Sequence, residues 1–204
     1  MTDVAVGGET FHLTHPESAE ALFDEREFAR DERIPYWADL WPSARGLAAH
    51  LLKLDLAGRR AIELGCGIGL PGIVAASRGA HVTATDHYAP ALDFAAYNAR
   101  TNTGRLIDTR LLDWHRPETA GLGAFDLILA ADVLYERRNV APLAALTTEL
   151  LSEKGEIILA DPRRAGGGLF VREMGSRGFS AASEETTVVQ DGRNVTVAVH
   201  HLSR

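Results

Sequence analysis

The chain has 204 residues, of which 46% are hydrophobic and 24% charged, and its formal net charge is −7. This composition is that of one globular domain and excludes a disordered chain. The negative charge disfavours nucleic acid as the main partner, and the single cysteine, Cys66, permits no intramolecular disulfide. Because the N-terminus has no signal-peptide pattern and no apolar run reaches the roughly 20 residues that cross a bilayer, we expect a cytoplasmic protein without membrane contact, a monomer or weak dimer.

The first 35 residues are polar and acidic, with a short helix expected near Glu17–Arg30. We interpret residues 1–35 as an N-terminal extension and residues 36–204 as the functional domain. The extension is either a loosely packed arm or a lid over a site. The next helix is expected to start at Pro42, because proline suits a first helical turn, and to end before Gly58.

From residue 60 onward, apolar strands alternate with helical patterns. The expected strands are Ala61–Leu64, His81–Thr85, Leu106–Leu112, Phe125–Ala131 and Glu156–Ala160, and the expected helices are Gly72–Arg78, Pro90–Asn102 and one containing Leu143, Leu146 and Leu150. Two further strands, Thr186–Gln190 and Asn194–His200, flank an Asp-Gly pair that favours a type I′ hairpin turn. The sequence therefore predicts an α/β, Rossmann-like, doubly wound fold. Its mainly parallel seven-stranded sheet would end in a C-terminal antiparallel hairpin, with helices on both faces.

A glycine-rich loop, Glu63–Gly72, follows the first of these strands and precedes a helix. Its glycines permit a tight turn and a close approach to a ligand. Position 70, where a dinucleotide-binding loop would have its third glycine, is Leu70. In addition, Glu63 would repel a diphosphate but attract an ammonium group. The loop therefore favours S-adenosylmethionine, which carries an ammonium and a sulfonium but no phosphate, over a nicotinamide dinucleotide.

Acidic residues close the next two strands. Asp86 lies 17 residues after Gly69, where a carboxylate can accept hydrogen bonds from ribose hydroxyls; the alternative is a plain turn-forming Asp. Asp113 and Trp114 close the third strand, where they can bind and cover an adenine. The alternative for Trp114 is a half-buried residue that caps the sheet edge.

Four segments carry a resemblance to a known family: 35–42, with Tyr36, Trp37 and Trp41; 63–72; 125–135; and Asp161-Pro162-x-Arg164. With them the chain resembles the class I, seven-β-strand S-adenosylmethionine-dependent methyltransferases. Within these it resembles the branch of protein-lysine methyltransferases that includes the electron-transfer-flavoprotein β-subunit lysine methyltransferase. That family usually has a glycine where this chain has Arg163, which leaves the substrate open.

The resemblance implies cofactor contacts from several of these residues and places Asp132 and Tyr135 at the methyl-transfer end. Together with the residues above, the predicted cofactor-binding set is Trp41, Glu63, Gly65, Cys66, Gly67, Gly69, Asp86, Asp113, Trp114 and Ala131. The residues themselves agree for Asp132 and Tyr135: they follow a central strand, where open α/β sheets bind ligands, and residues three apart face one way in a turn or helix. The alternative is an N-cap Asp beside a packed Tyr.

We therefore expect an N-methyltransferase that acts on a lysine of a protein substrate. Asp132 would orient the amine and Tyr135 would wall the site, while Tyr36 and Trp37 line its mouth or pack in the core. The alternatives are a methyltransferase for a small amine or heterocycle, a protein-arginine enzyme, and a catalytically silent cofactor-binding protein. The histidine spacing does not favour a metal site. Arg163, Arg164 and Gly166–Gly168 are expected to form a polar, mobile loop.

Overall fold

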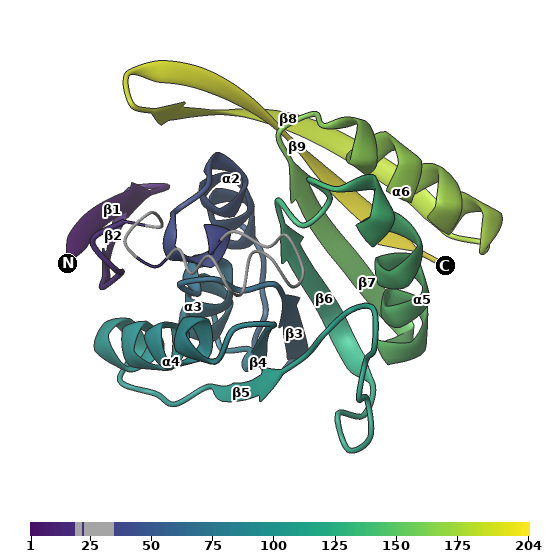
Figure 1. Ribbon diagram of the computed structural model, residues 1–204, viewed down its shortest axis with the longest axis horizontal. Helices are drawn as coiled ribbons and strands as arrows, with labels where there is room; N and C mark the ends of the chain where they lie inside the picture. The colour runs from purple at the N-terminus through teal and green to yellow at the C-terminus, as the bar shows by residue number, and fades with distance from the viewer. Residues whose placement is uncertain (19–21, 23–34) are drawn as a thin grey trace.

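The computed structural model describes residues 1–18, 22 and 35–204 and shows an open, twisted sheet between two groups of helices (Figure 1). The sheet has seven strands in the order β5-β4-β3-β6-β7-β9-β8. The strands are β3 Arg60–Leu64, β4 His81–Asp86, β5 Asp108–Leu111, β6 Phe125–Ala131, β7 Leu151–Asp161, β8 Ser180–Gln190 and β9 Arg193–Ser203. The pairs among β3 to β7 are parallel, whereas β9 runs antiparallel to both β7 and β8. The predicted fold class is confirmed.

The helices cover both faces of this sheet (Figure 1). They are α2 Pro42–Leu51, α3 Leu70–Ser77, α4 Ala89–Thr103, α5 Val140–Leu150 and α6 Ala165–Ser176, with 3-10 turns η2 Tyr36–Ala38 and η3 Arg137–Asn139. Strand β6 explains the arrangement, because alternate residues of a strand point to opposite faces. Leu127 and Leu129 pack in the apolar cluster of α2, α3 and α4, while Ile128 and Ala130 pack in the cluster of α5 and α6. A strand that is buried on both faces has a nearly continuous run of apolar residues in its sequence.

The first residues form a packed hairpin, so the expected loose arm is wrong for this part of the extension. Strands β1 Thr2–Val6 and β2 Glu9–Leu13 pair antiparallel. Alternate apolar residues of the hairpin, Val4 and Leu13 among them, are buried in the cluster with α2 and α3. Asn98 of α4 fixes the hairpin's exit by accepting a hydrogen bond from the Thr14 amide at 2.8 Å. The helix expected at Glu17–Arg30 lies almost wholly outside the described residues.

The glycine run 166–168 is helical, which corrects the expected mobile loop. These glycines lie in the first turns of α6, and Gly166 and Gly167 are buried. A Cβ at Gly166 would collide with the carbonyl oxygen of Leu134, and one at Gly167 would lie 3.0 Å from a carboxyl oxygen of Asp161. Gly166 and Gly167 therefore let α6 approach its neighbours closely, and at these two positions packing outweighs the low helix propensity of glycine.

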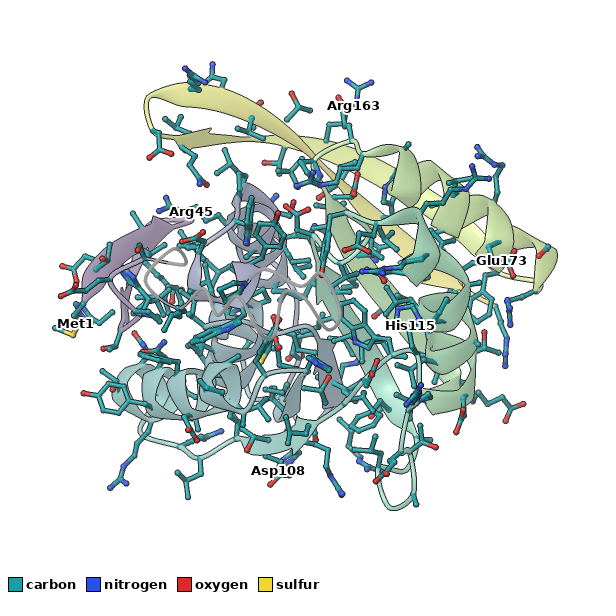
Figure 2. The ribbon with its side chains drawn as sticks, viewed as in Figure 1. Met1, Arg45, Asp108, His115, Arg163 and Glu173 are labelled. Atoms are coloured by element: carbon teal, nitrogen blue, oxygen red, sulfur yellow. The ribbon has the colours of Figure 1, made fainter. Side chains whose placement is uncertain are left out.

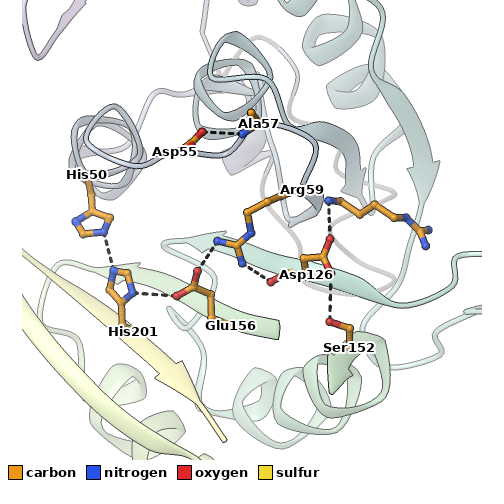
Figure 3. Close-up of polar contacts among 9 residues, drawn as sticks. His50, Asp55, Ala57, Arg59, Asp126, Ser152, Glu156 and His201 are labelled. Atoms are coloured by element: carbon orange, nitrogen blue, oxygen red, sulfur yellow. Dashed lines mark hydrogen bonds and ion pairs between the residues drawn. The ribbon is translucent and has the colours of Figure 1, made fainter. Parts of the chain in front are cut away.

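A polar chain joins α2 to the C-terminal strands (Figure 3). His50 of α2 lies 2.6 Å from His201 of β9 between their Nε2 atoms. The Nδ1 atom of His50 is 2.6 Å from Glu184 of β8, and that of His201 is 3.6 Å from Glu156 of β7. Arg59 also pairs with Glu156. This chain fixes α2, whose first turn borders the site described below.

No helix in the described part of the chain is long and apolar enough to cross a membrane.

Candidate functional site

A cavity of about 520 Å³ opens at the carboxyl ends of the central strands, a volume typical of small-ligand sites. It lies where β3 and β6 are neighbours and the strand order reverses, which is the ligand-binding crevice of open α/β sheets. The predicted residues that line it are Trp41, Glu63, Gly65, Cys66, Gly67, Asp86, Asp113, Trp114, Ala131, Asp132 and Tyr135. Tyr36 and Trp37 line it too.

Gly69 is the one predicted site residue that does not line the cavity. It precedes α3 with φ 91°, and its amide donates to the Cys66 carbonyl at 2.8 Å. A Cβ there would lie 2.9 Å from the Cβ of Ala95 in α4. The structure therefore uses this glycine to turn the chain into α3 against α4.

Two glycines of the loop shape the cavity directly. Gly65 and Gly67 have φ of 69° and 51°, the left-handed region that favours glycine. A Cβ on Gly65 would lie 2.8 Å from the Trp114 ring, and one on Gly67 would lie 2.9 Å from the Trp37 carbonyl oxygen. The backbone of the loop can therefore pass closely between these two tryptophans.

The acids of the loop end are buried and bonded to the backbone. Glu63 accepts a hydrogen bond from the Gly72 amide at 2.9 Å, and burial raises the pKa of its carboxyl to about 8. Asp86 accepts from the amides of Gly67 and Tyr88, each at 3.0 Å, and burial raises its pKa as well. A carboxylate has about four lone-pair sites, so Asp86 can still accept a hydrogen bond from a ligand hydroxyl.

Trp114 and Asp113 also line the cavity. The indole nitrogen of Trp114 is buried and, within the described residues, has no hydrogen-bond partner. Asp113 accepts from the His115 amide at 2.9 Å. An indole face beside polar groups suits a planar heterocycle, which agrees with the expectation for an adenine.

Asp132 lies directly after β6 and has an unusual backbone conformation. Its φ is 57°, a conformation uncommon for residues other than glycine, and its amide donates to the Ala160 carbonyl at 2.9 Å. The side chain is buried, with Arg164 Nε donating to Oδ1 at 2.8 Å and Ser43 Oγ donating to Oδ2 at 3.5 Å. The turn thus holds a carboxylate fixed in the cavity wall.

Aromatic residues surround Asp132 at the mouth of the cavity. Tyr135 is 43% exposed. Its ring stands edge-on to Tyr36 at 5.8 Å, and Tyr36 stands edge-on to Trp41 at the same distance. Asp132 and Tyr135 therefore line one cavity, as the spacing predicts, but Tyr135 is at the solvent side while Asp132 is inside.

Arg164, which the sequence analysis placed in a polar loop, was not predicted as a site residue. It lines the cavity and precedes α6. Its position in the sequence could have indicated this role. Arg164 follows Asp161, the last residue of β7, by three positions, and the carboxyl ends of the parallel neighbours β6 and β7 meet at one edge of the sheet. Asp161 itself is buried behind it, and burial raises the pKa of this carboxyl to about 6. The described residues contain no cluster that could hold a metal ion.

A sequence model of the lysine methyltransferase family matches residues 33–179 of the 204. The chain belongs to this family.

Individual relatives agree with the match. The chain is 39% identical to zebrafish (Danio rerio) protein N-lysine methyltransferase METTL21A over 65% of its own length and 63% of the relative's. It is 30% identical to the zebrafish electron transfer flavoprotein beta subunit lysine methyltransferase, over 64% of this chain and 51% of that one. A Xenopus laevis protein named histone-arginine methyltransferase METTL23 is 32% identical over 58% and 53% of the two chains. The matches thus span about half to two thirds of these relatives.

Solved structures share the fold. Magnesium protoporphyrin IX methyltransferase (ChlM) from Synechocystis, solved with bound S-adenosylmethionine, superposes with a TM-score of 0.63 at 19% identity, covering 90% of this chain and 94% of that one. A putative RNA methyltransferase from Pyrococcus horikoshii gives 0.62 at 16% identity, covering 82% and 88%. At these identities the likeness establishes the architecture.

Proposed function

We propose that this protein transfers a methyl group from S-adenosylmethionine to the side-chain amine of a lysine in a protein substrate. Membership of the lysine methyltransferase family supports this. One observation carries the proposal: a single cavity contains both the glycine loop with its neighbouring acids and the turn that presents Asp132 and Tyr135. Donor and acceptor could therefore meet inside one hollow that opens to solvent at its aromatic mouth.

The residues present fit this cofactor. Three acidic residues, Glu63, Asp86 and Asp113, line the loop end, where their oxygens suit an ammonium, ribose hydroxyls and an exocyclic amine. The buried indole nitrogen of Trp114, which has no hydrogen-bond partner among the described residues, could donate to a bound ligand. Gly65 and Gly67 keep the loop thin enough for close contact. The product that leaves the same site would be S-adenosylhomocysteine.

When bound, the cofactor supplies an electrophilic methyl group on a sulfonium. The protein must hold an unprotonated amine opposite it, since effective transfer needs near-attack geometry. Asp132, fixed by Arg164 and Ser43, would accept a hydrogen bond from that amine. Tyr135 and Tyr36 would line the path of the lysine stem and exclude water, because aromatic faces suit a cationic or aliphatic chain.

The test is to incubate the purified protein with methyl-labelled S-adenosylmethionine and cell extract. We expect label to run with protein and, after acid hydrolysis, with methylated lysine. Label in methylarginine would favour the reaction named for the METTL23 relatives, and label among small metabolites would favour the small-molecule alternative. Failure to bind S-adenosylmethionine in calorimetry, with binding of NAD instead, would overturn the proposal at its base.

The predicted cytoplasmic location, the monomer or weak dimer, and the preference for protein over nucleic acid stay predictions.

A further inference from the structure

Arg164 contacts both acids that follow the two neighbouring strands β6 and β7. Its Nε donates to Asp132 Oδ1 at 2.8 Å, and its backbone amide donates to Asp161 Oδ1 at 2.5 Å. The hydrogen bond from its amide fixes the backbone of Arg164, and its side chain extends to the cavity, which it lines. This geometry makes Arg164 a bridge between the loop after β7 and the wall of the site.

The pair with Asp132 is asymmetric in burial. The Asp132 side chain is 6% exposed and that of Arg164 is 39% exposed. Without the guanidinium, the carboxylate would be a nearly buried charge with Ser43 as its remaining donor among the described residues. Such a charge is costly. With it, the nearly buried carboxylate is paired directly with a positive charge.

The pairing of Asp132 with Arg164 affects how an acceptor amine would lose its proton. A lysine amine has a pKa of about 10.4 in water and must lose its proton before it can attack. A carboxylate with unbalanced charge beside the amine would stabilise the ammonium form and oppose this loss. A carboxylate that is already paired with a guanidinium can still accept a hydrogen bond on a free lone pair, but it holds the ammonium less strongly.

We propose that Arg164 is a positioning residue that fixes and neutralises the Asp132 carboxylate, so that an acceptor amine meets a hydrogen-bond acceptor that does not hold it as ammonium. This inference rests on the proposed function. Other polar groups face the pair from every neighbouring element: Asp161 from β7, Ser43 from α2 and Tyr36 from η2. Asp161 does not line the cavity. Because burial raises its pKa only to about 6, its charge changes little above pH 7.

The neighbouring residue provides a matched control. Arg163 points outward, away from the body of the molecule (Figure 2), and pairs with Glu185 at 3.5 Å. It does not line the cavity. Replacing Arg163 or Arg164 by glutamine removes the same charge one position apart, so the two variants differ in contact with Asp132 and not in net charge.

The first measurement is the pH dependence of kcat from pH 7 to 10, on the protein that the wild type labels most strongly in extract. Arg164→Gln is expected to move the rise of kcat to higher pH by about one unit. It should therefore be about tenfold slower at pH 7.5 and should recover much of the rate near pH 10. Arg164→Lys, which keeps the charge, should be slower by a similar factor at every pH, with an unmoved profile. Arg163→Gln should match the wild type.

The second measurement needs no acceptor. In thermal unfolding, Arg164→Gln should lower Tm by at least about 3 °C in the wild-type background, and by much less in an Asp132→Asn background, because the buried charge is then gone. Arg163→Gln should not show this dependence. If the wild type labels no protein, the proposed function fails. The double-mutant comparison of Tm values still decides whether Arg164 and Asp132 interact. Additive Tm changes, or an Arg164→Gln profile that is lowered equally at all pH values, would overturn the inference.

Discussion

At the scale of single residues, Asp132 combines three features that a surface aspartate does not need. Its backbone is left-handed, with φ 57°, its side chain is buried, and a guanidinium and a hydroxyl hold its two oxygens. A strained and buried polar residue in a cavity is costly to keep. These features support a role in the reaction more strongly than a role in capping.

We expect Asp132→Asn to keep S-adenosylmethionine affinity within a few-fold while turnover falls by about two orders of magnitude or more, the range of positioned acid–base or polar groups. Calorimetry gives the affinity, and label transfer to protein gives the rate. Asp93→Asn, at an exposed position of α4, is the control and should change neither quantity. Equal losses of binding and turnover would remove Asp132 from the catalytic end of the site.

The raised pKa of Glu63 predicts that cofactor binding releases protons. Its pKa of about 8 in the free protein means that most of this carboxyl is protonated at pH 7. A bound ammonium would favour the ionised form, so binding should release up to about one proton at pH 7 and should tighten as the pH rises toward 8. Calorimetry in buffers of different ionisation enthalpy measures this release.

Glu63→Gln should abolish the proton release. A ligand control separates Glu63 from Asp86: 5′-methylthioadenosine keeps the ribose but lacks the ammonium, so its binding should release no proton. If both ligands release the same number of protons, the ammonium is not bound at Glu63.

At the scale of elements, the close approach of α6 to the turn after β6 sets the outer wall of the site. Gly166 contacts Leu134 in the middle of the Asp132–Tyr135 turn, and Gly167 contacts Asp161. Helix α6 therefore supports both acids that Arg164 bridges. Gly168, by contrast, has open space beside it, since the atom nearest to a Cβ added there would be an Arg172 nitrogen at 3.8 Å.

Two alanine substitutions in one helix turn should consequently have opposite effects. Gly166→Ala should destabilise the protein by about 1–3 kcal/mol, because the new methyl meets backbone, and should reduce turnover by displacing the turn. Gly168→Ala should stabilise it by about 0.5–1 kcal/mol through helix propensity. Denaturant unfolding measures both. Equal effects from the two substitutions would show that α6 does not pack against this turn.

The same contacts explain what sequence reasoning could predict. Buried strands such as β6 have an uninterrupted apolar run, so their position followed from the sequence pattern. The site residues at the strand ends were predicted from that pattern together with the family resemblance. Gly166 was misread because it is needed for a contact with Leu134, 32 positions earlier, which no local pattern contains. The bridge from Arg164 to Asp132 has the same non-local origin. The N-terminal hairpin did have a local signal, the Gly7-Gly8 pair between alternating apolar residues.

At the scale of the whole molecule, the polar chain of Figure 3 connects His50 of α2 to β9 and β7, and a contact between His50 and Glu184 adds β8. Its central carboxyl, Glu156, has its pKa lowered to about 2, first by its hydrogen bond with His201 and also by Arg59. A carboxyl with a lowered pKa in the folded state stabilises the fold above its unfolded pKa of about 4.5. That contribution is lost as the pH falls from about 4.5 toward 2.

We therefore expect Glu156→Gln to lower Tm by about 2–4 °C at pH 6, where the polar contacts of Glu156 are intact. The difference in Tm from wild type should shrink below pH 4. Comparing the two proteins at each pH removes the opposing contributions of Glu63 and Asp161, whose pKa values are raised. Thermal melts from pH 6 to 2.5 give the difference curve. A difference that stays constant over this range would mean that Glu156 stabilises the fold by packing alone.

The position of the cavity between β3 and β6 also divides the chain for protein engineering. The residues at the donor loop precede Ala131, whereas Asp132, Tyr135 and Arg164 follow it. A chimera that takes its segment from 132 to the C-terminus from a relative would exchange most of the acceptor wall as one cassette. The half that is proposed to bind the cofactor, with the β1–β2 hairpin and α2 to α4, would be inherited unchanged.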